Sequence, residues 1–105
     1  MAFVRRHNDM GNMCVVARRG DPIAGQIFIE VDHLDGTRSL FTPAPTVSRG
    51  DSAGQMFQRR FERVEPAKVR ERIDQEISFD PDLWVLSIDL RSDELGIDLV
   101  REYGG

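Results

Sequence analysis

The stretch GQIFIEVDHLDGTRSLF, residues 25–41, decides the expected fold. Apolar and other side chains alternate over residues 25–32, which is the period of a strand whose two faces differ. Asp35-Gly36 then separates this run from residues 37–41, and an Asp-Gly pair between two such runs is typical of a tight hairpin turn. The stretch therefore predicts two neighbouring antiparallel strands, with His33 in a solvated turn.

Two further strands are expected near the ends of the chain. Residues 13–18 (MCVVAR) form a short β-branched run, and Cys14 within it is typical of a buried, inert thiol. Residues 83–90 (LWVLSIDL) alternate again, with Trp84, Leu86, Ile88 and Leu90 on one face. This last run is the best candidate for a central strand.

The middle of the chain combines a loop with a more ambiguous segment. Prolines and a polar, glycine-rich run predict an exposed loop over residues 43–54. Residues 55–64 fit a strand better than a helix after such a loop. Phe57 and Phe61, four positions apart, are expected to share one face in either case.

One convincing helix is predicted over residues 66–78. Pro66 suits a first helical position, and Val69, Ile73 and Ile77 repeat every four residues between charges. A short helix is also possible over residues 3–8. The sequence therefore predicts an α+β fold, in which a small antiparallel sheet of about four strands carries one main helix on one face.

Composition indicates a single small domain spanning residues 1–105. The chain has 14 Lys+Arg and 18 Asp+Glu, a net charge of −4, and nine acidic against two basic residues after position 73, so residues 91–105 read as an acidic, flexible tail. One cysteine excludes an internal disulfide and a CxxC metal site. No phosphate-cradling loop and no membrane-length apolar run is present, so we expect a cytoplasmic protein without a cofactor, a metal or a membrane partner.

The segment FDPDLW, residues 79–84, holds the first group of candidate site residues. Asp80 and Asp82 are spaced so that a turn can direct both carboxylates toward one cation or one water, as a metal-assisted hydrolase requires. Phe79 and Trp84 would then shield them, or Trp84 would line a partner groove. Alternatively, both carboxylates accept backbone hydrogen bonds in a helix-to-strand turn. No catalytic residue is assigned.

Interleaved arginines and aromatics form the second group. Such a mixture can hold phosphates and stack bases, which makes these residues candidates for nucleic-acid or phosphate-ligand binding: Arg59, Arg60, Arg63, Phe57 and Phe61. Neighbouring glutamates and the acidic net charge favour a solvated, salt-bridged face instead, so nucleic acid is the weaker expectation.

Several segments also resemble a known family in their order and spacing: residues 15–31 (VVARRGDPIAGQIFIEV), 34–37 (LDGT), 43–45 (PAP) and above all 79–89 (FDPDLWVLSID). They are similar to the small alphaproteobacterial proteins catalogued as domain of unknown function 1491. The resemblance implies the segment boundaries and a bacterial cytosol, and it implies no mechanism.

Taken together, these features favour a non-enzymatic protein-interaction module. We expect a homodimer, because a short chain with an exposed edge strand gains burial by pairing, and an unidentified protein as a further partner. The weak nucleic-acid or phosphate-ligand binder and the hydrolase that uses Asp80 and Asp82 remain the alternatives.

Overall fold

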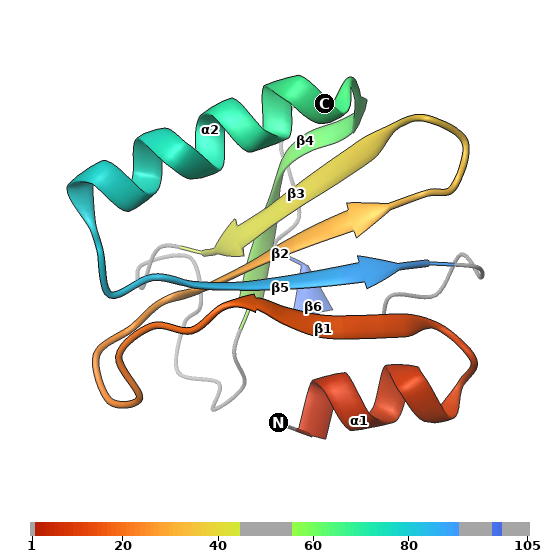
Figure 1. Cartoon of the computed structure of the whole chain (residues 1–105), viewed down its shortest axis with the longest axis horizontal. Coiled ribbons are helices and arrows are strands. Elements are labelled where there is room, and N and C mark those ends of the chain that lie inside the picture. Colours follow the sequence, from red (N-terminus) through yellow and green to blue (C-terminus); the bar gives the residue numbers. More distant parts are fainter. Residues whose placement is uncertain (1, 45–55, 91–97, 100–105) are drawn as a thin grey trace.

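The computed structural model describes residues 2–44, 56–90 and 98–99 of the chain. Within these ranges it contains two helices and six strands (Figure 1). In chain order they are α1 (Ala2–Asp9), β1 (Met13–Arg18), β2 (Ile27–Asp32), β3 (Arg38–Pro43), β4 (Met56–Val64), α2 (Pro66–Phe79), β5 (Trp84–Asp89) and the two-residue β6 (Asp98–Leu99).

The strands form one sheet in the order β1-β5-β2-β3-β4-β6. The α+β class is confirmed, and β5 is central as predicted. The prediction of a purely antiparallel sheet of about four strands is wrong, because β2 pairs with β5 and β4 pairs with β6 in parallel. Helix α2 is the reason for the first parallel pair: it carries the chain back across the sheet, so that β5 enters beside β2 in the same direction (Figure 1).

The predicted hairpin is confirmed as β2 and β3, which are antiparallel with Asp32 opposite Arg38. The Asp35 carboxylate accepts hydrogen bonds from the backbone N–H and the hydroxyl of Thr37. Gly36 has a φ of 90°, a left-handed value that glycine adopts without a steric penalty. The turn is wider than the predicted Asp-Gly pair: the His33 N–H donates to the Thr37 carbonyl around residues 34–36, and Leu34 rather than Asp35 has the second positive φ, 64°.

Helix α2 covers one face of the sheet. The predicted helix is confirmed within one residue at its end, and Val69 and Ile73 are buried along it. They pack in a cluster with side chains from three strands and the turn before β5: Phe28, Leu40, Leu83 and Val85. Phe28 is therefore buried, so β2 contributes to the core on both of its faces.

The opposite face carries the second core cluster, which the short N-terminal helix α1 covers near β1 (Figure 1). Its buried members are Cys14, Ile29, Val31, Phe41, Phe57, Leu86, Ile88 and Leu90. Phe3 and Val4 of α1 pack against this cluster. The possible helix over residues 3–8 is thus present, and the sheet lies between two helices rather than under one.

An irregularity in β4 separates Phe57 from Phe61. Phe41 lies opposite Arg59, whereas the next residue of β3, Leu40, lies opposite Phe61, so Arg60 is an extra residue in the strand. Such a β-bulge reverses the faces of all residues beyond it. Phe57 packs in the cluster on the α1 side and Phe61 against the cluster on the α2 side, which corrects the prediction of a shared face.

Strand β3 extends to Pro43, and Ala44 after it is buried. The rest of the predicted loop, residues 45–54, lies outside the described residues, as does the predicted acidic tail apart from residues 98–99. In the part of the chain that is described, no helix has the length and apolar character needed to cross a membrane.

Candidate functional site

Asp80 and Asp82 lie in the turn between α2 and β5. The Asp80 N–H donates to the carbonyl of Glu76 at 2.8 Å, which ends the helix, and the Asp80 carboxylate accepts a hydrogen bond from the Asp82 N–H at 3.2 Å. The side chain of Asp82 is exposed, and Phe79, which is 81% exposed, does not shield either carboxylate. The geometry therefore matches the turn-stabilising alternative for Asp80.

This turn is held against the loop between β1 and β2. The Asp21 N–H donates to the Asp82 carbonyl at 2.9 Å. The indole N–H of Trp84 donates to the Asp21 carbonyl at 2.8 Å, and the backbone N–H of Trp84 donates to the carbonyl of Gln26 at 2.8 Å. Trp84 is thus half-buried and fixes two distant segments together instead of lining an open groove.

Two glycines permit this close approach. A Cβ atom added at Gly20 would lie 2.0 Å from the Asp82 carbonyl oxygen, and one added at Gly25 would lie 2.3 Å from the same atom. The Asp21 carboxylate closes the loop by accepting hydrogen bonds from the N–H groups of Ala24 and Ile23, which lower the pKa of Asp21. Residues 20–25 and 79–84 belong to the segments that resemble a known family, and their close contact gives that resemblance a structural explanation.

The structure does not bring the predicted arginine and phenylalanine residues together on one surface. Arg59 lies over the ring of Phe41 at 5.7 Å, on the α1 side of the sheet. Arg60, one residue further, donates from Nε to the hydroxyl of Thr42 at 3.2 Å and lies on the α2 side. Arg63 pairs with Asp35 at 3.0 Å at the hairpin end, and Phe57 is buried.

A serine–histidine pair that the sequence did not indicate lies beside Arg63. The Ser39 hydroxyl is 2.7 Å from His33 Nε2 and accepts the Arg63 N–H at 3.0 Å, so a neutral His33 can accept the serine proton. Burial lowers the pKa of His33, and the Arg63 cation acts in the same direction. Ser39 is only 2% exposed, so the pair joins strands rather than meeting a substrate.

Strand β1 forms an outer edge of the sheet and carries an exposed apolar surface. Met13 is 61%, Val15 50% and Val16 38% exposed. No charged side chain interrupts residues 13–17. Natural edge strands are usually protected by charges, prolines or bulges, and unprotected apolar edges pair with other chains. The register of β1 shifts only between Val16 and Arg18, so residues 13–16 before the shift pair regularly with β5. The strand predicted over residues 13–18 is thus present, and its side chains apart from Cys14 are largely exposed.

The N-terminal helix occupies one position of this edge. Asn8 of α1 accepts the Cys14 N–H and donates to the Cys14 carbonyl, both at 3.0 Å. The N–H and the carbonyl of Cys14 thus point away from β5. Because the hydrogen-bonding direction alternates from residue to residue along an antiparallel strand, the N–H and the carbonyl of Val16 point away from β5 as well. Cys14 itself is 1% exposed, and burial raises the pKa of its thiol, which fits an inert thiol.

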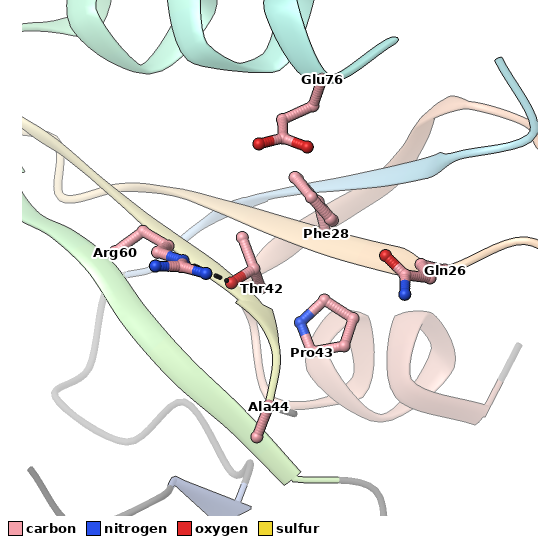
Figure 2. A pocket seen from close by; sticks show the side chains of 7 residues that line it. All are labelled: Gln26, Phe28, Thr42, Pro43, Ala44, Arg60 and Glu76. Carbon is pink, nitrogen blue, oxygen red and sulfur yellow. Dashed lines mark hydrogen bonds between the residues drawn. The ribbon is translucent and has the colours of Figure 1, made fainter. Parts of the chain in front are cut away.

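A cavity of about 280 Å³ lies on the other side of the molecule, between α2, the start of β2, the end of β3 and the middle of β4 (Figure 2). Its wall consists of Gln26, Phe28, Thr42, Pro43, Ala44, Arg60 and Glu76. Figure 2 shows Glu76 extending from α2 toward the sheet while Arg60 lies beside Thr42. Sequence reading missed this cavity because its residues come from segments 50 positions apart.

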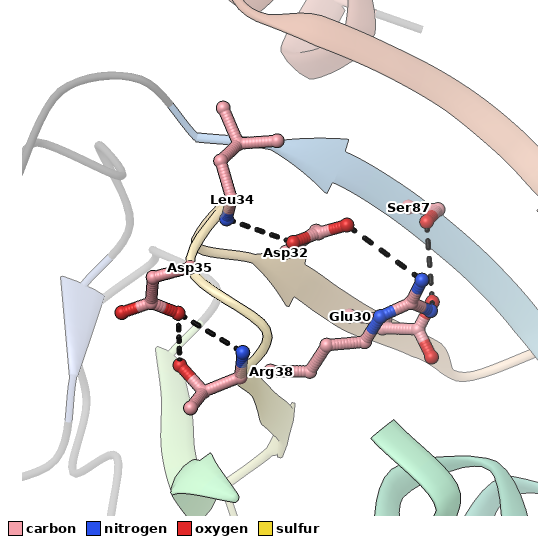
Figure 3. Close-up of polar contacts among 7 residues, drawn as sticks. Glu30, Asp32, Leu34, Asp35, Arg38 and Ser87 are labelled. Atoms are coloured by element: carbon pink, nitrogen blue, oxygen red, sulfur yellow. Dashed lines mark hydrogen bonds and ion pairs between the residues drawn. The ribbon is translucent and has the colours of Figure 1, made fainter. Parts of the chain in front are cut away.

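Polar side chains continue over the sheet beyond α2 (Figure 3). Arg38 contacts Glu30 at 2.9 Å and Asp32 at 3.6 Å, and Ser87 donates to Glu30 at 3.2 Å. The Asp32 carboxylate also accepts the N–H of Leu34. This network couples β2, β3 and β5. Across the described ranges, no group of three or more His, Cys, Asp or Glu side chains is placed to hold a metal ion.

These features define a small α+β domain whose mixed sheet lies between two helices and ends in an apolar edge strand. The chain belongs to the DUF1491 family: the model of this protein family of unknown function matches residues 1–98. The resemblance predicted from the sequence is therefore confirmed.

Three solved structures share this architecture. A solution structure of a protein from Agrobacterium tumefaciens is 30% identical, with a TM-score of 0.82, over 99% of this chain and 92% of that one. A crystal structure of a DUF1491 protein from Caulobacter crescentus is 28% identical, with a TM-score of 0.77, over 93% and 91% of the two chains. An NMR structure of a DUF1491 protein from the same organism has 29% identity and a TM-score of 0.75 over 93% and 88%. Comparison with curated proteins found no match.

Proposed function

We propose that this protein is a non-enzymatic interaction module that forms a homodimer through the outer edge of β1. The observation that carries the proposal is the combination of an outermost strand with three exposed apolar side chains, Met13, Val15 and Val16. Such a strand offers both backbone hydrogen bonds and apolar area to a partner.

A second copy is the occupant that the edge suits best. A strand paired antiparallel with itself is related by a two-fold axis, which is the commonest symmetry of protein dimers. Because residues 13–17 carry no charge, the two copies would place no like charges opposite each other. Asn8 already binds the backbone of Cys14, so the pairing centres on Val16, whose N–H meets the Val16 carbonyl of the other copy.

The two other functions considered from the sequence receive less support. Arg59 and Arg60 lie on opposite sides of the sheet and cannot both bind the same nucleic-acid strand. Asp80 and Asp82 act in a turn, and Trp84 is bound to Asp21. The proposal places the dimer in the cytoplasm, where a single buried thiol such as Cys14 stays reduced.

Light scattering over micromolar to millimolar concentrations tests the dimer. We expect a mass of twice 11.9 kDa at the upper end. Val16→Pro removes an N–H that points away from β5, so it should leave the fold intact and give a monomer. Val16→Thr keeps both the N–H and the side-chain shape and is the matched control, which should remain dimeric.

Two results would contradict the proposal. A mass of 11.9 kDa at every concentration would exclude the dimer. A dimer that persists in Val16→Pro would show that the copies meet through another surface. If the protein is monomeric and another protein adds a strand at β1, the interaction module stands and the homodimer does not.

A further inference from the structure

The cavity between α2 and the sheet is separate from β1 and presents opposite charges toward one space (Figure 2). Arg60 supplies a guanidinium from the β4 bulge, and Glu76 supplies a carboxylate from the last turns of α2. Since both side chains line the same cavity of about 280 Å³, a ligand there meets a cation and an anion at once.

Both charged groups are held in place before any ligand arrives. Arg60 Nε donates to the Thr42 hydroxyl at 3.2 Å, and one carboxylate oxygen of Glu76 accepts from Arg72 Nε at 2.9 Å. The side-chain oxygen of Gln58 also accepts from the Arg60 guanidinium, at 2.7 Å from Nη2. Because a guanidinium has five N–H donors, Arg60 still keeps some of them for a ligand. Fixed side chains lose little conformational entropy on binding, which favours recognition of a small molecule.

A buried hydroxyl lies beside the Arg60 guanidinium. Thr42 is 5% exposed and lines the cavity, and its oxygen accepts a hydrogen bond from Arg60. A hydroxyl that accepts one hydrogen bond can still donate its own proton, so Thr42 can donate to an acceptor atom of a ligand in the cavity. Phe28, also 5% exposed, gives the cavity an apolar wall.

We propose that this cavity binds a small zwitterion of the α-amino-acid type. Its carboxylate is bound by the Arg60 guanidinium and the Thr42 hydroxyl, and its ammonium group by the Glu76 carboxylate. A zwitterion matches both charges of the wall, whereas a simple carboxylic acid gains nothing from Glu76, which Arg72 already pairs at 2.9 Å, and a simple amine gains nothing from Arg60. The volume is just below the range of about 300–1,000 Å³ typical of pockets for drug-sized ligands, which suits a smaller molecule.

The test is an NMR titration of the full chain with each of the common α-amino acids, followed by backbone amide shifts. We expect at least one to give saturable shifts around Thr42 and Arg60. The same compound without its amine, and the same compound without its carboxylate, should each bind at least tenfold more weakly, about 1.4 kcal/mol.

Three substitutions sharpen the test. Arg60→Gln and Glu76→Gln should each abolish the saturable shifts. Arg59→Gln is the matched control, because Arg59 is adjacent in sequence but lies on the other side of the sheet over Phe41. It should bind like the original chain, and Val16→Pro should as well, since the dimer edge lies elsewhere.

The proposal is overturned if no amino acid gives a saturable shift at millimolar concentration. It is also overturned if the compound without its amine binds as tightly, because Glu76 would then have no part in recognition. Unchanged binding in folded Arg60→Gln protein would place any ligand outside this cavity.

Discussion

The segments FDPDLW at residues 79–84 and MCVVAR at residues 13–18 differ in what surrounds them. Around the first, two backbone segments are in direct contact: the Asp82 carbonyl lies so close to Gly20 and Gly25 that neither glycine could carry a Cβ atom. Around the second, Met13 and Val15 are at least half exposed, and β1 has no strand on its outer side among the described residues. A distinctive motif can thus mark a tight structural junction, while an ordinary apolar run provides the open surface.

The largest effect that separates the two regions is expected at the junction. Gly20→Ala should destabilise the protein by about 3 kcal/mol or more, because the new methyl group meets backbone atoms at 2.0 Å that cannot move aside independently. Urea unfolding followed by Trp84 fluorescence measures it. Gly36→Ala is the control: it has open space around it and should cost only the about 1–2 kcal/mol of a left-handed backbone. Equal losses at both positions would refute the tight junction.

A smaller effect is expected within the FDPDLW motif itself. Trp84→Phe removes the indole hydrogen bond to the Asp21 carbonyl and should cost about 1–2 kcal/mol in urea unfolding followed by circular dichroism. Phe79→Ala, at an 81% exposed side chain of the same motif, should change stability by no more than about 0.5 kcal/mol. If Phe79→Ala proved the more damaging change, the motif would have a role that this junction does not explain.

The smallest stability effect concerns pH and His33. Burial and the Arg63 cation lower the pKa of His33 below its ordinary 6.5, against the opposing carboxylates of Asp35, Asp32 and Glu62. The folded state therefore prefers neutral His33, and its contribution is present above about pH 6.5 and lost as pH falls through the lowered pKa.

Urea unfolding between pH 7.5 and 5, compared with His33→Gln, measures this contribution. The difference in unfolding free energy between the two proteins should shrink toward the acidic end. A difference that grows as the pH falls would mean that Ser39 binds protonated His33. That result would contradict a neutral His33 that accepts the hydroxyl proton of Ser39.

Local sequence patterns predicted the hairpin, α2 and the central strand because each depends on neighbouring residues. Asp35 and Gly36 shape their turn through contacts within residues 34–37, and Val69 and Ile73 define the buried side of α2. The parallel pairing of β2 with β5 depends on the path of the chain after β4, which no local pattern contains. The β4 bulge likewise arises from pairing with β3, and it moved Phe61 to the other face.

The candidate sites were less predictable for a related reason. Asp80, Asp82 and Trp84 stood out as chemistry-bearing residues, yet their backbone contacts with residues 20–26 explain them. The cavity needs Arg60 of β4, Thr42 of β3 and Glu76 of α2 side by side, and only the tertiary fold brings these segments together. The exposure of β1 follows from its place at the sheet edge, which depends on where β5 enters.

Amide hydrogen exchange at Val16 is the sharpest test of the proposed dimer, because it measures hydrogen bonding at the β1 edge itself. Protection of the Val16 N–H is expected to rise with protein concentration as β1 pairs with β1 of a second copy. The Cys14 N–H, bound by Asn8 within one chain, serves as the internal reference and should be equally protected at every concentration. Fast exchange of Val16 that is independent of concentration would contradict the proposed dimer edge.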